Sequence, residues 1–212
     1  MTRGRFIALE GGEGAGKSTQ ARLLAEALRR QGHEVLLTRE PGGTPGAEAI
    51  RSLLLHPPGE GWKVEAEALL FAAARADHVA RAIRPALEAG HWVICDRFLD
   101  SSRAYQGGGG GMADADLLAL HRIGSGALLP DLALLLEAPE EAVAARIARR
   151  DGDELDAIGG RDAGYHQHVA QAFRRFAEDE PARFVRIDAS GTPEATHEAI
   201  MRALAPLLGH ER

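Results

Sequence analysis

The sequence has no asparagine, a single cysteine and no long apolar run, and each of these features narrows what the chain can be. A guanine-specific GTPase reads its base with an Asn-Lys-x-Asp motif, which a chain without asparagine cannot contain. Cys95 has no cysteine partner for an intrachain disulfide, so we expect a cytoplasmic protein. No apolar run reaches the roughly 18–20 residues that cross a bilayer, and the N-terminal residues show no signal-peptide pattern. We therefore expect no membrane partner.

Lysine is also scarce, because Lys17 and Lys63 are the only two and arginine fills the other basic positions. The lack of thermolabile Asn and Cys fits a thermophile, but a GC-rich genome would also favour Arg, Ala and Gly. Both explanations remain open. Because the sequence has so few lysines, the one retained at position 17 is informative.

The formal net charge is −6, which argues against a protein that coats nucleic acid.

Apolar runs and helical periodicities alternate along the 212 residues, a length that suits one domain spanning residues 1–212. We predict strands at residues 6–9, 35–38, 92–95, 132–136 and 184–187. We predict helices at residues 19–31, 47–55, 64–88 with a possible kink at Pro85, 114–123, 140–150 and 194–208. This order is typical of an α/β fold with a parallel sheet covered on both faces, whose ligands bind at the carboxyl ends of the strands.

Two glycine-rich stretches lie outside these elements. Residues 107–111 are five consecutive glycines, which we interpret as a mobile loop near a site. Residues 151–164 are polar and glycine-rich and lie between two expected helices. We predict that a lid occupies residues 148–163.

The segment from Gly11 to Ser18 matches the phosphate-binding pattern G-x-x-x-x-G-K-[ST] at every fixed position. It follows an expected strand and opens an expected helix, which is the context that the motif requires. Backbone N–H groups and the helix N-terminus would hold phosphate, Lys17 would contact the β- and γ-phosphates, and Ser18 would bind Mg²⁺. The predicted ATP-binding residues are Gly11, Gly12, Glu13, Gly14, Ala15, Gly16, Lys17, Ser18 and Thr19.

A phosphate-binding loop establishes nucleotide binding but leaves the use of the nucleotide open. In a chain this short, a kinase of small molecules is the simplest reading. Another nucleotide or deoxynucleoside kinase is one alternative. A nucleotide-dependent switch or assembly ATPase without a small-molecule acceptor is another, and it would hydrolyse ATP slowly whatever nucleoside is added.

Several further segments, in order and at similar spacing, resemble bacterial thymidylate kinases along nearly the whole chain. They are residues 7–11, the phosphate loop, 38–44 (TREPGGT), 71–75 (FAAAR), 96–98 (DRF), and Ser101, Ser102 and 104–107. The resemblance implies a five-stranded parallel sheet of the P-loop nucleoside monophosphate kinase type, with a mobile lid, and a homodimer. It also implies transfer of the γ-phosphate of ATP to dTMP, giving dTDP and ADP, a step of dTTP biosynthesis.

Asp96 and Arg97 follow the third expected strand, beside the phosphate loop. A carboxylate there can hold Mg²⁺, with Ser18, as a Walker-B acid does, although a structural ion pair is the alternative for Asp96. The planar guanidinium of Arg97 suits a phosphate. The resemblance implies that Arg97 holds the acceptor phosphate and the transferred group, and that Arg39 lies near the acceptor phosphate.

Phe71 and Arg75 are four residues apart on one expected helix, so they lie on the same face. Such a pair can stack on a pyrimidine and donate to thymine O4, although core packing also accounts for Phe71 alone. The resemblance implies that Glu13 bonds the 3′-hydroxyl of the acceptor sugar. We expect Tyr105 to close the sugar pocket against a 2′-hydroxyl, and Ser102 and Gln106 to lie along the base edge.

Phosphoryl transfer is helped by a cation at the moving group, and the family carries it either in the phosphate loop just after the acid or in the lid. The residue after Glu13 is Gly14, which carries no charge, so the resemblance implies that an arginine near the lid acts in catalysis. The candidates are Arg146, Arg149, Arg150 and Arg161, with solvated helix-end arginines as the alternative. The family often has Asp-Arg-x-Glu in the lid where this chain has Asp-Ala-Ile-Gly at 156–159, and Gly110 replaces a residue that is often basic.

Other residues have a simpler interpretation. We expect Cys95 to be a small buried core residue. His166 and His168 are two apart on an expected helix and do not face each other, so we predict no metal site there. Five leucines suit either a dimer face or the core: Leu117, Leu118, Leu120, Leu128 and Leu129.

Overall fold

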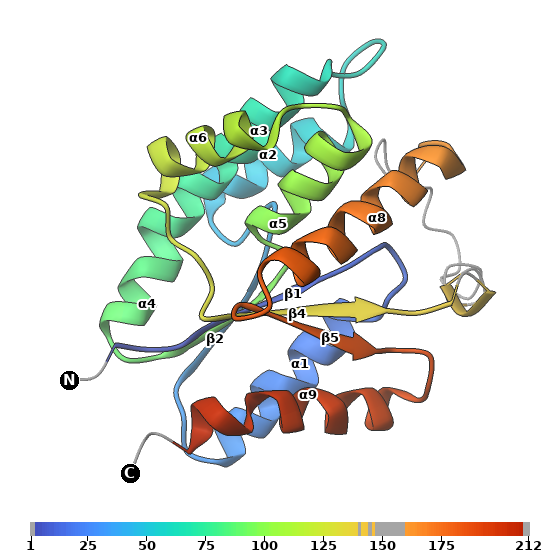
Figure 1. Ribbon diagram of the computed structural model, residues 1–212. Coiled ribbons are helices and arrows are strands. Elements are labelled where there is room, and N and C mark those ends of the chain that lie inside the picture. Colours follow the sequence, from blue (N-terminus) through green and yellow to red (C-terminus); the bar gives the residue numbers. More distant parts are fainter. Residues whose placement is uncertain (1–2, 140, 144–145, 147–159, 210–212) are drawn as a thin grey trace.

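A computed structural model describes residues 3–139, 141–143, 146 and 160–209. Five parallel strands form one sheet in the order β2-β3-β1-β4-β5 (Figure 1). The strands are β1 Phe6–Glu10, β2 Val35–Arg39, β3 Trp92–Asp96, β4 Leu132–Glu137 and β5 Phe184–Asp188. The prediction of a five-stranded parallel α/β sheet is therefore confirmed.

Helices cover both faces of the sheet, because alternate strand residues face opposite sides and both sides are apolar. Helices α1 (Lys17–Arg30) and α9 (Pro193–Leu208) pack side by side on one face (Figure 1). Ile7 and Leu9 join the core beneath them, while Phe6 and Ala8 face the opposite layer. The central strands are buried on both sides, and their carboxyl ends carry the polar residues.

The opposite layer contains the helices that lie around the site. They are α2 Pro45–Leu55, α3 Val64–His78, α5 Leu99–Ser102, α6 Asp114–Ser125 and α8 Ala163–Asp179. The π-helical segment η1 (Val79–Ile83) joins α3 to α4 (Arg84–Glu88). The predicted helix over residues 64–88 thus forms, and the helix widens just before Pro85, whose ring nitrogen cannot donate to the preceding turn.

The prediction that residues 107–111 form a mobile loop was wrong for most of the run. Residues 107–109 belong to a second π-helical segment, η2 (Arg103–Gly109), which packs against α8. A Cβ at Gly108 would lie 2.5 Å from Cβ of Ala172, and one at Gly109 would lie 2.5 Å from the Tyr165 ring. Glycine is required here because the two helices approach too closely for any side chain.

The predicted helix over residues 140–150 lies mostly outside the described residues, of which 141–143 and 146 are helical. Residues 148–159 of the predicted lid lie outside them as well. No helix among the residues that the structure describes is long and apolar enough to cross a membrane.

Candidate active site

The phosphate loop connects the buried end of β1 to the start of α1. Gly11 has φ of +130°, and a Cβ there would lie 2.4 Å from the carbonyl oxygen of Leu136, so only glycine fits. Gly16 caps α1 in the left-handed conformation at φ of 94°. These two positions turn the backbone so that its N–H groups and the α1 N-terminus can surround an anion.

Lys17 is buried at the first position of α1, and its Nζ donates to the carbonyl oxygen of Gly12 at 2.6 Å. Burial and then the positive charge of Arg97 lower the pKa of Lys17 to about 7. An ammonium held in this way needs negative charge to keep its proton. The phosphate oxygens of a nucleotide are suited to provide it.

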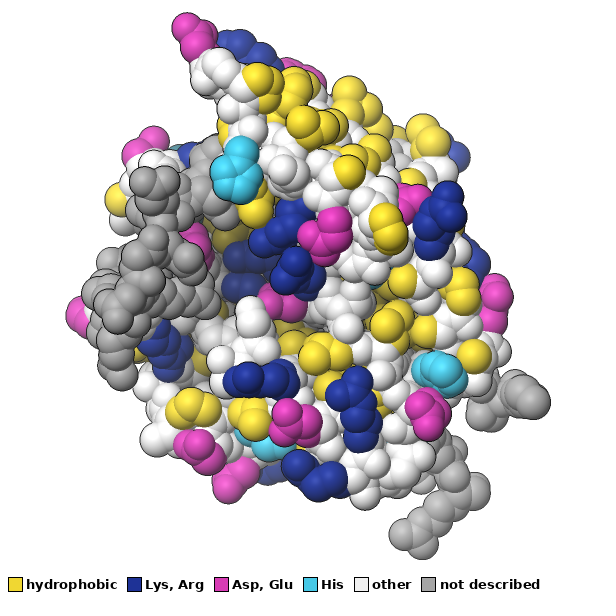
Figure 2. All heavy atoms as spheres, turned by 180° about the vertical axis from the view of Figure 1, so that it is seen from behind, with side chains coloured by type: hydrophobic (Ala, Val, Ile, Leu, Met, Phe, Trp, Pro, Cys, Tyr) yellow, Lys and Arg dark blue, Asp and Glu magenta, His cyan; other side chains and the backbone are white. Residues whose placement is uncertain are grey.

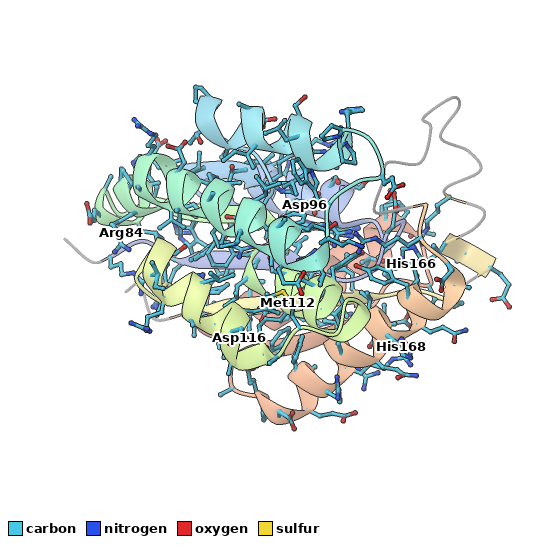
Figure 3. The ribbon with its side chains drawn as sticks, turned by 90° about the horizontal axis from the view of Figure 1, so that it is seen from above. Arg84, Asp96, Met112, Asp116, His166 and His168 are labelled. Carbon is cyan, nitrogen blue, oxygen red and sulfur yellow. The ribbon has the colours of Figure 1, made fainter. Side chains whose placement is uncertain are left out.

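Ser18 and Asp96 meet where α1 begins and β3 ends, 78 residues apart in the chain. Ser18 Oγ donates to Asp96 Oδ2 at 2.5 Å, and Asp96 Oδ1 is buried with no hydrogen-bond partner in the part of the chain that the structure describes. Figure 3 shows Asp96 near the middle of the molecule, whereas His166 and His168 lie along α8. Hydroxyl and carboxylate oxygens are the ligands that Mg²⁺ prefers, so this pair fits that ion. Within the described residues, no group of three His, Cys, Asp or Glu side chains is arranged to hold a metal alone.

Arg97 follows β3 in the left-handed backbone region, with φ of 69°, which is strained for a residue with a side chain. Its Nη1 donates to the carbonyl oxygen of Gly11 and to Ser101 Oγ, each at 3.1 Å. Its Nη2 donates to the Tyr105 hydroxyl at 3.2 Å, and the guanidinium lies 5.0 Å from the centre of the Tyr105 ring. The bend thus aims a positive charge at the mouth of the phosphate loop.

Glu10 is a site residue that the sequence analysis did not single out. It ends β1, is completely buried, and accepts from the Phe98 backbone N–H at 2.9 Å and from Ser101 Oγ at 2.6 Å. Burial, and next the charge of Asp100, raise the pKa of Glu10 to about 7. The carboxyl group holds the turn that carries Arg97. Its sequence signal is an acidic residue that directly follows four buried apolar ones.

Arg75 lies buried on α3, where three acceptors hold it. Its Nε donates to Glu40 Oε2 at 2.7 Å, and its Nη2 donates to Ser102 Oγ at 2.9 Å and to the carbonyl oxygen of Phe98 at 3.2 Å. No described residue accepts from Nη1, so its hydrogens can bind a ligand. Phe71, one turn earlier, is partly exposed, so its ring is not simply a core residue.

Gln106 and Tyr105 lie on η2 and are both buried. The structure brings two predicted pairs into direct contact: Ser102 accepts from Arg75, and Tyr105 accepts from Arg97. Gln106 contacts Glu67 on α3, a buried residue that the sequence analysis also missed. Glu13 is partly exposed in the loop, and its charge acts on the pKa of Lys17.

Other predicted residues are less closely joined to this group. Arg39 is 56% exposed and pairs with Glu48 at 3.3 Å. Arg146 Nη2 donates to the carbonyl oxygen of Ala189 at 2.7 Å, and its Nη1 lies 3.4 Å from that of Gly14. Arg161 pairs with Glu67 instead of with the loop. Arg149 and Arg150 lie outside the described residues.

Figure 2 shows that Lys and Arg side chains gather in a hollow on one face of the molecule, with acidic side chains beside them. A buried lysine, two arginines with donors to spare and an anion-binding loop suit the transfer of a phosphoryl group between two phosphorylated ligands. An aromatic ring and an arginine on α3 suit a base on the acceptor side.

A family model of thymidylate kinase matches residues 9–200 of the chain, which include every residue of this site. The chain belongs to the thymidylate kinase family. As a thymidylate kinase it phosphorylates dTMP to dTDP, with ATP as the donor that the family implies.

Known relatives support this membership over the full length. A thymidylate kinase of Rhizorhabdus wittichii is 57% identical over 205 residues, covering 97% of this chain and 99% of that protein. One of Gluconobacter oxydans is 51% identical, covering 95% and 94%. The crystal structure of thymidylate kinase from Ehrlichia chaffeensis, 28% identical, superimposes with a TM-score of 0.77 over 95% of this chain and 99% of that one. The predicted family, fold and activity are confirmed.

Proposed function

We propose that this thymidylate kinase moves the γ-phosphate of ATP to dTMP with Lys17 and Arg97 holding the migrating group. An oxygen of the dTMP phosphate attacks the γ-phosphorus, the bond to the β-γ bridging oxygen breaks, and ADP leaves. The observation that carries the proposal is that Lys17 is buried and Arg97 is partly buried at the loop, and that both donate to its carbonyls. Neither forms an ion pair with a carboxylate among the described residues, so their charge is available to phosphate.

Ser18 and Asp96 would hold Mg²⁺, because their oxygens meet beside Lys17 and one oxygen of Asp96 has no partner among the residues described. Bound Mg²⁺ would neutralise charge on the β- and γ-phosphate oxygens. The remaining residues of the loop, from Gly11 to Thr19, surround the donor phosphates with backbone N–H groups.

On the acceptor side, we assign the thymine base to Phe71 and Arg75. Phe71 would stack on the ring, and Arg75 Nη1 would donate to O4, since its other nitrogens are already bonded. Tyr105 would form the wall of the sugar pocket on the side of Arg97, and Glu13 would accept a hydrogen bond from the 3′-hydroxyl. Arg39 would break its ion pair with Glu48 and approach the acceptor phosphate.

The additional cation of the transfer step comes, in our proposal, from the segment that carries Arg146, Arg149, Arg150 and Arg161. Arg146 is a described candidate that reaches the phosphate loop. Each arginine is changed to Ala and turnover is measured at saturating dTMP and ATP. We expect at least one variant to fall by about 100-fold or more with little change in the KM for dTMP. Near-native turnover in all four variants and in the combined variant would exclude the mechanism.

We also propose a homodimer formed through α3 and α6, which pack on each other and expose apolar side chains. Leu69 is 56% and Ile123 is 75% exposed, and Figure 2 shows hydrophobic side chains over the side of the molecule where these helices lie. Of the five candidate leucines, Leu118 and Leu129 are exposed and Leu117 is buried. Ile123→Glu should lower the sedimentation coefficient from that of a dimer to that of a monomer, because it places a charge in the apolar face. A monomeric wild-type enzyme at micromolar concentration would contradict the proposal.

The test of the whole assignment is ADP release across the nucleoside monophosphates, in wild type and in Lys17→Ala. Wild-type ADP release should depend on dTMP, and Lys17→Ala should reduce turnover by at least about 10³-fold with an unchanged far-UV circular dichroism spectrum. Wild-type turnover in that variant would refute the ATP site. Slow ADP release that ignores every added nucleotide would favour a switch ATPase.

A further inference from the structure

Glu67 is a buried acid on the helix face that carries the proposed base site. It lies four residues before Phe71 and eight before Arg75, so all three share one face of α3. The residue is only 4% exposed, although acidic side chains are rarely buried unless they are paired. It also lines a cleft of about 430 Å³ with Leu54 and Arg161. A buried carboxylate does not contribute to solubility, so its place at the base site indicates another role.

The two oxygens of Glu67 have different partners. Oε1 accepts from Gln106 Nε2 at 2.7 Å, and Oε2 accepts from Nη2 of Arg161. Arg161 in turn donates to the Tyr165 hydroxyl at 2.5 Å. An ionised carboxylate can only accept hydrogen bonds, so it fixes the amide of Gln106 with the NH₂ group toward Glu67.

The other end of that amide is then fixed as an acceptor. Gln106 is 1% exposed, and its Oε1 is buried with no hydrogen-bond partner among the described residues. Such an oxygen is unfavourable unless a ligand brings a donor. Ser102 and Gln106 lie one helical turn apart and contact Arg75 and Glu67 of α3, respectively. Gln106 thus presents a lone pair, and Arg75 the hydrogens of Nη1, along the same junction between α3 and η2.

We propose that Glu67 is a positioning residue that sets base selectivity by holding the Gln106 oxygen toward the ring N3 of the acceptor pyrimidine. A donor beside an acceptor matches the O4 and N3–H edge of thymine or uracil. Cytosine places a lone pair at N3, which would face the lone pair of Gln106. The inference rests on the proposed placement of the base against Phe71 and Arg75.

The decisive measurement is the ratio of kcat/KM for dTMP to that for dCMP, with the full-length enzyme and saturating ATP. Glu67→Ala frees the amide to rotate, and we expect the ratio to fall at least tenfold while the KM for ATP stays within twofold. Arg161→Ala is the matched control, because it removes the other partner of Glu67 and leaves Gln106 bonded. Its ratio should stay within threefold of wild type.

The charge-swapped variant Glu67→Lys/Arg161→Glu keeps an ion pair but reverses the hydrogen bond to Gln106. The new ammonium would attract Oε1 and turn the NH₂ group toward the base. We expect the dTMP to dCMP ratio to fall by about 100-fold without inverting, because Arg75 still disfavours the amino group of cytosine. This variant carries the test if Glu67→Ala does not fold.

Unchanged ratios in Glu67→Ala and in the charge swap would overturn the proposal, as would an equal loss of selectivity in Arg161→Ala. A dTMP analogue methylated at N3 tests the base placement separately with the wild-type enzyme. If that analogue reacts like dTMP, the placement itself is wrong. If it is rejected and the Glu67 variants keep their selectivity, only the role of Glu67 is wrong.

Discussion

Two clusters of buried arginine lie on the same side of the sheet and differ in how many of their donors are used. Arg103 and Arg183 share the carboxylates of Asp100 and Glu180, and Asp114 adds two more bonds to Arg103. Each of these two arginines donates four hydrogen bonds to carboxylates. Arg75 donates one to the carboxylate of Glu40, and its Nη1 donates to no residue that the structure describes. We call the cluster of Arg103 and Arg183 the closed cluster, because carboxylates take most of its donors. The pair of Arg75 and Glu40 is the open cluster, because donors remain for a ligand.

This difference shows that burial alone does not mark a functional arginine. A guanidinium has five N–H donors in a fixed fork, so the donors that the protein leaves unused show where a ligand can bind. In the closed cluster, hydrogen bonds and charges from three acids raise the pKa of Arg103 against the effect of burial. In the open cluster, the positive charge of Arg75 acts on its neighbour His121, whose pKa is lowered by burial and then by this charge.

The largest effect on stability is expected from breaking the closed cluster. Asp100→Ala would leave Arg103 and Arg183 partly unpaired in a buried place, and we expect the free energy of unfolding in urea to fall by about 3–5 kcal/mol. The KM for dTMP should stay within threefold, since each arginine uses four of its five donors on carboxylates and neither is assigned to the substrate. A large rise in this KM with unchanged stability would show that the cluster acts on substrate and would break the distinction.

An intermediate effect, on binding, is expected from the open cluster. Arg75→Ala removes the donors proposed for thymine O4 while His78 still contacts Glu40 at 3.0 Å. We expect the KM for dTMP to rise by about 10–100-fold, the range for a hydrogen bond to a charged group, and the KM for ATP to change less than threefold. Steady-state kinetics with each substrate varied in turn measures both. Equal effects on the two substrates would mean that this helix face is only structural.

The smallest effect concerns pH. Burial, and next the charge of Arg75, lower the pKa of His121 to about 4, and its Nε2 lies 2.7 Å from the carbonyl oxygen of Leu128. Below pH 6.5 the unfolded chain binds a proton that the folded protein refuses, so this contribution to stability is complete above pH 6.5 and is lost as pH falls toward 4. Between pH 7 and pH 5 the loss should be about 2 kcal/mol.

Urea unfolding of wild type and His121→Gln at both pH values tests this. The glutamine can still donate to Leu128, but it has no proton to gain. The variant should therefore lose about 2 kcal/mol less than wild type between the two pH values. Identical pH dependence in the two proteins would mean that His121 takes up a proton as readily in the folded protein as in the unfolded chain.

The sequence was most informative where the signal is local. Strand bounds, the phosphate loop and the helix carrying Phe71 and Arg75 follow from patterns within about ten residues, and the structure agrees with them. Glu10, Glu40 and Glu67 were missed as site residues because their partners are distant in sequence: Phe98, Arg75 and Gln106 are 88, 35 and 39 residues away. From sequence alone, an acidic residue at a strand end or in a first helical turn is predicted to be solvent-exposed, because its buried partner cannot be identified.

The glycine run was misread for a related reason. Glycine disfavours helices in isolation, so five in succession suggest a loop. The deciding contact is with Ala172 and Tyr165 on α8, some 60 residues later, where only a glycine leaves room for the second helix. Tertiary packing thus overrode local propensity at the segment next to Tyr105 and Gln106.

The left-handed backbone of Arg97 sets stability and turnover against each other. A glycine at that position would relieve strain of about 1–3 kcal/mol, and it would remove the guanidinium that we assign to the migrating phosphate. The glycine variant would also lose the three hydrogen bonds that the guanidinium donates, so the two changes in stability oppose each other. A screen that ranks variants of this enzyme by melting temperature alone would therefore miss the loss of activity at position 97.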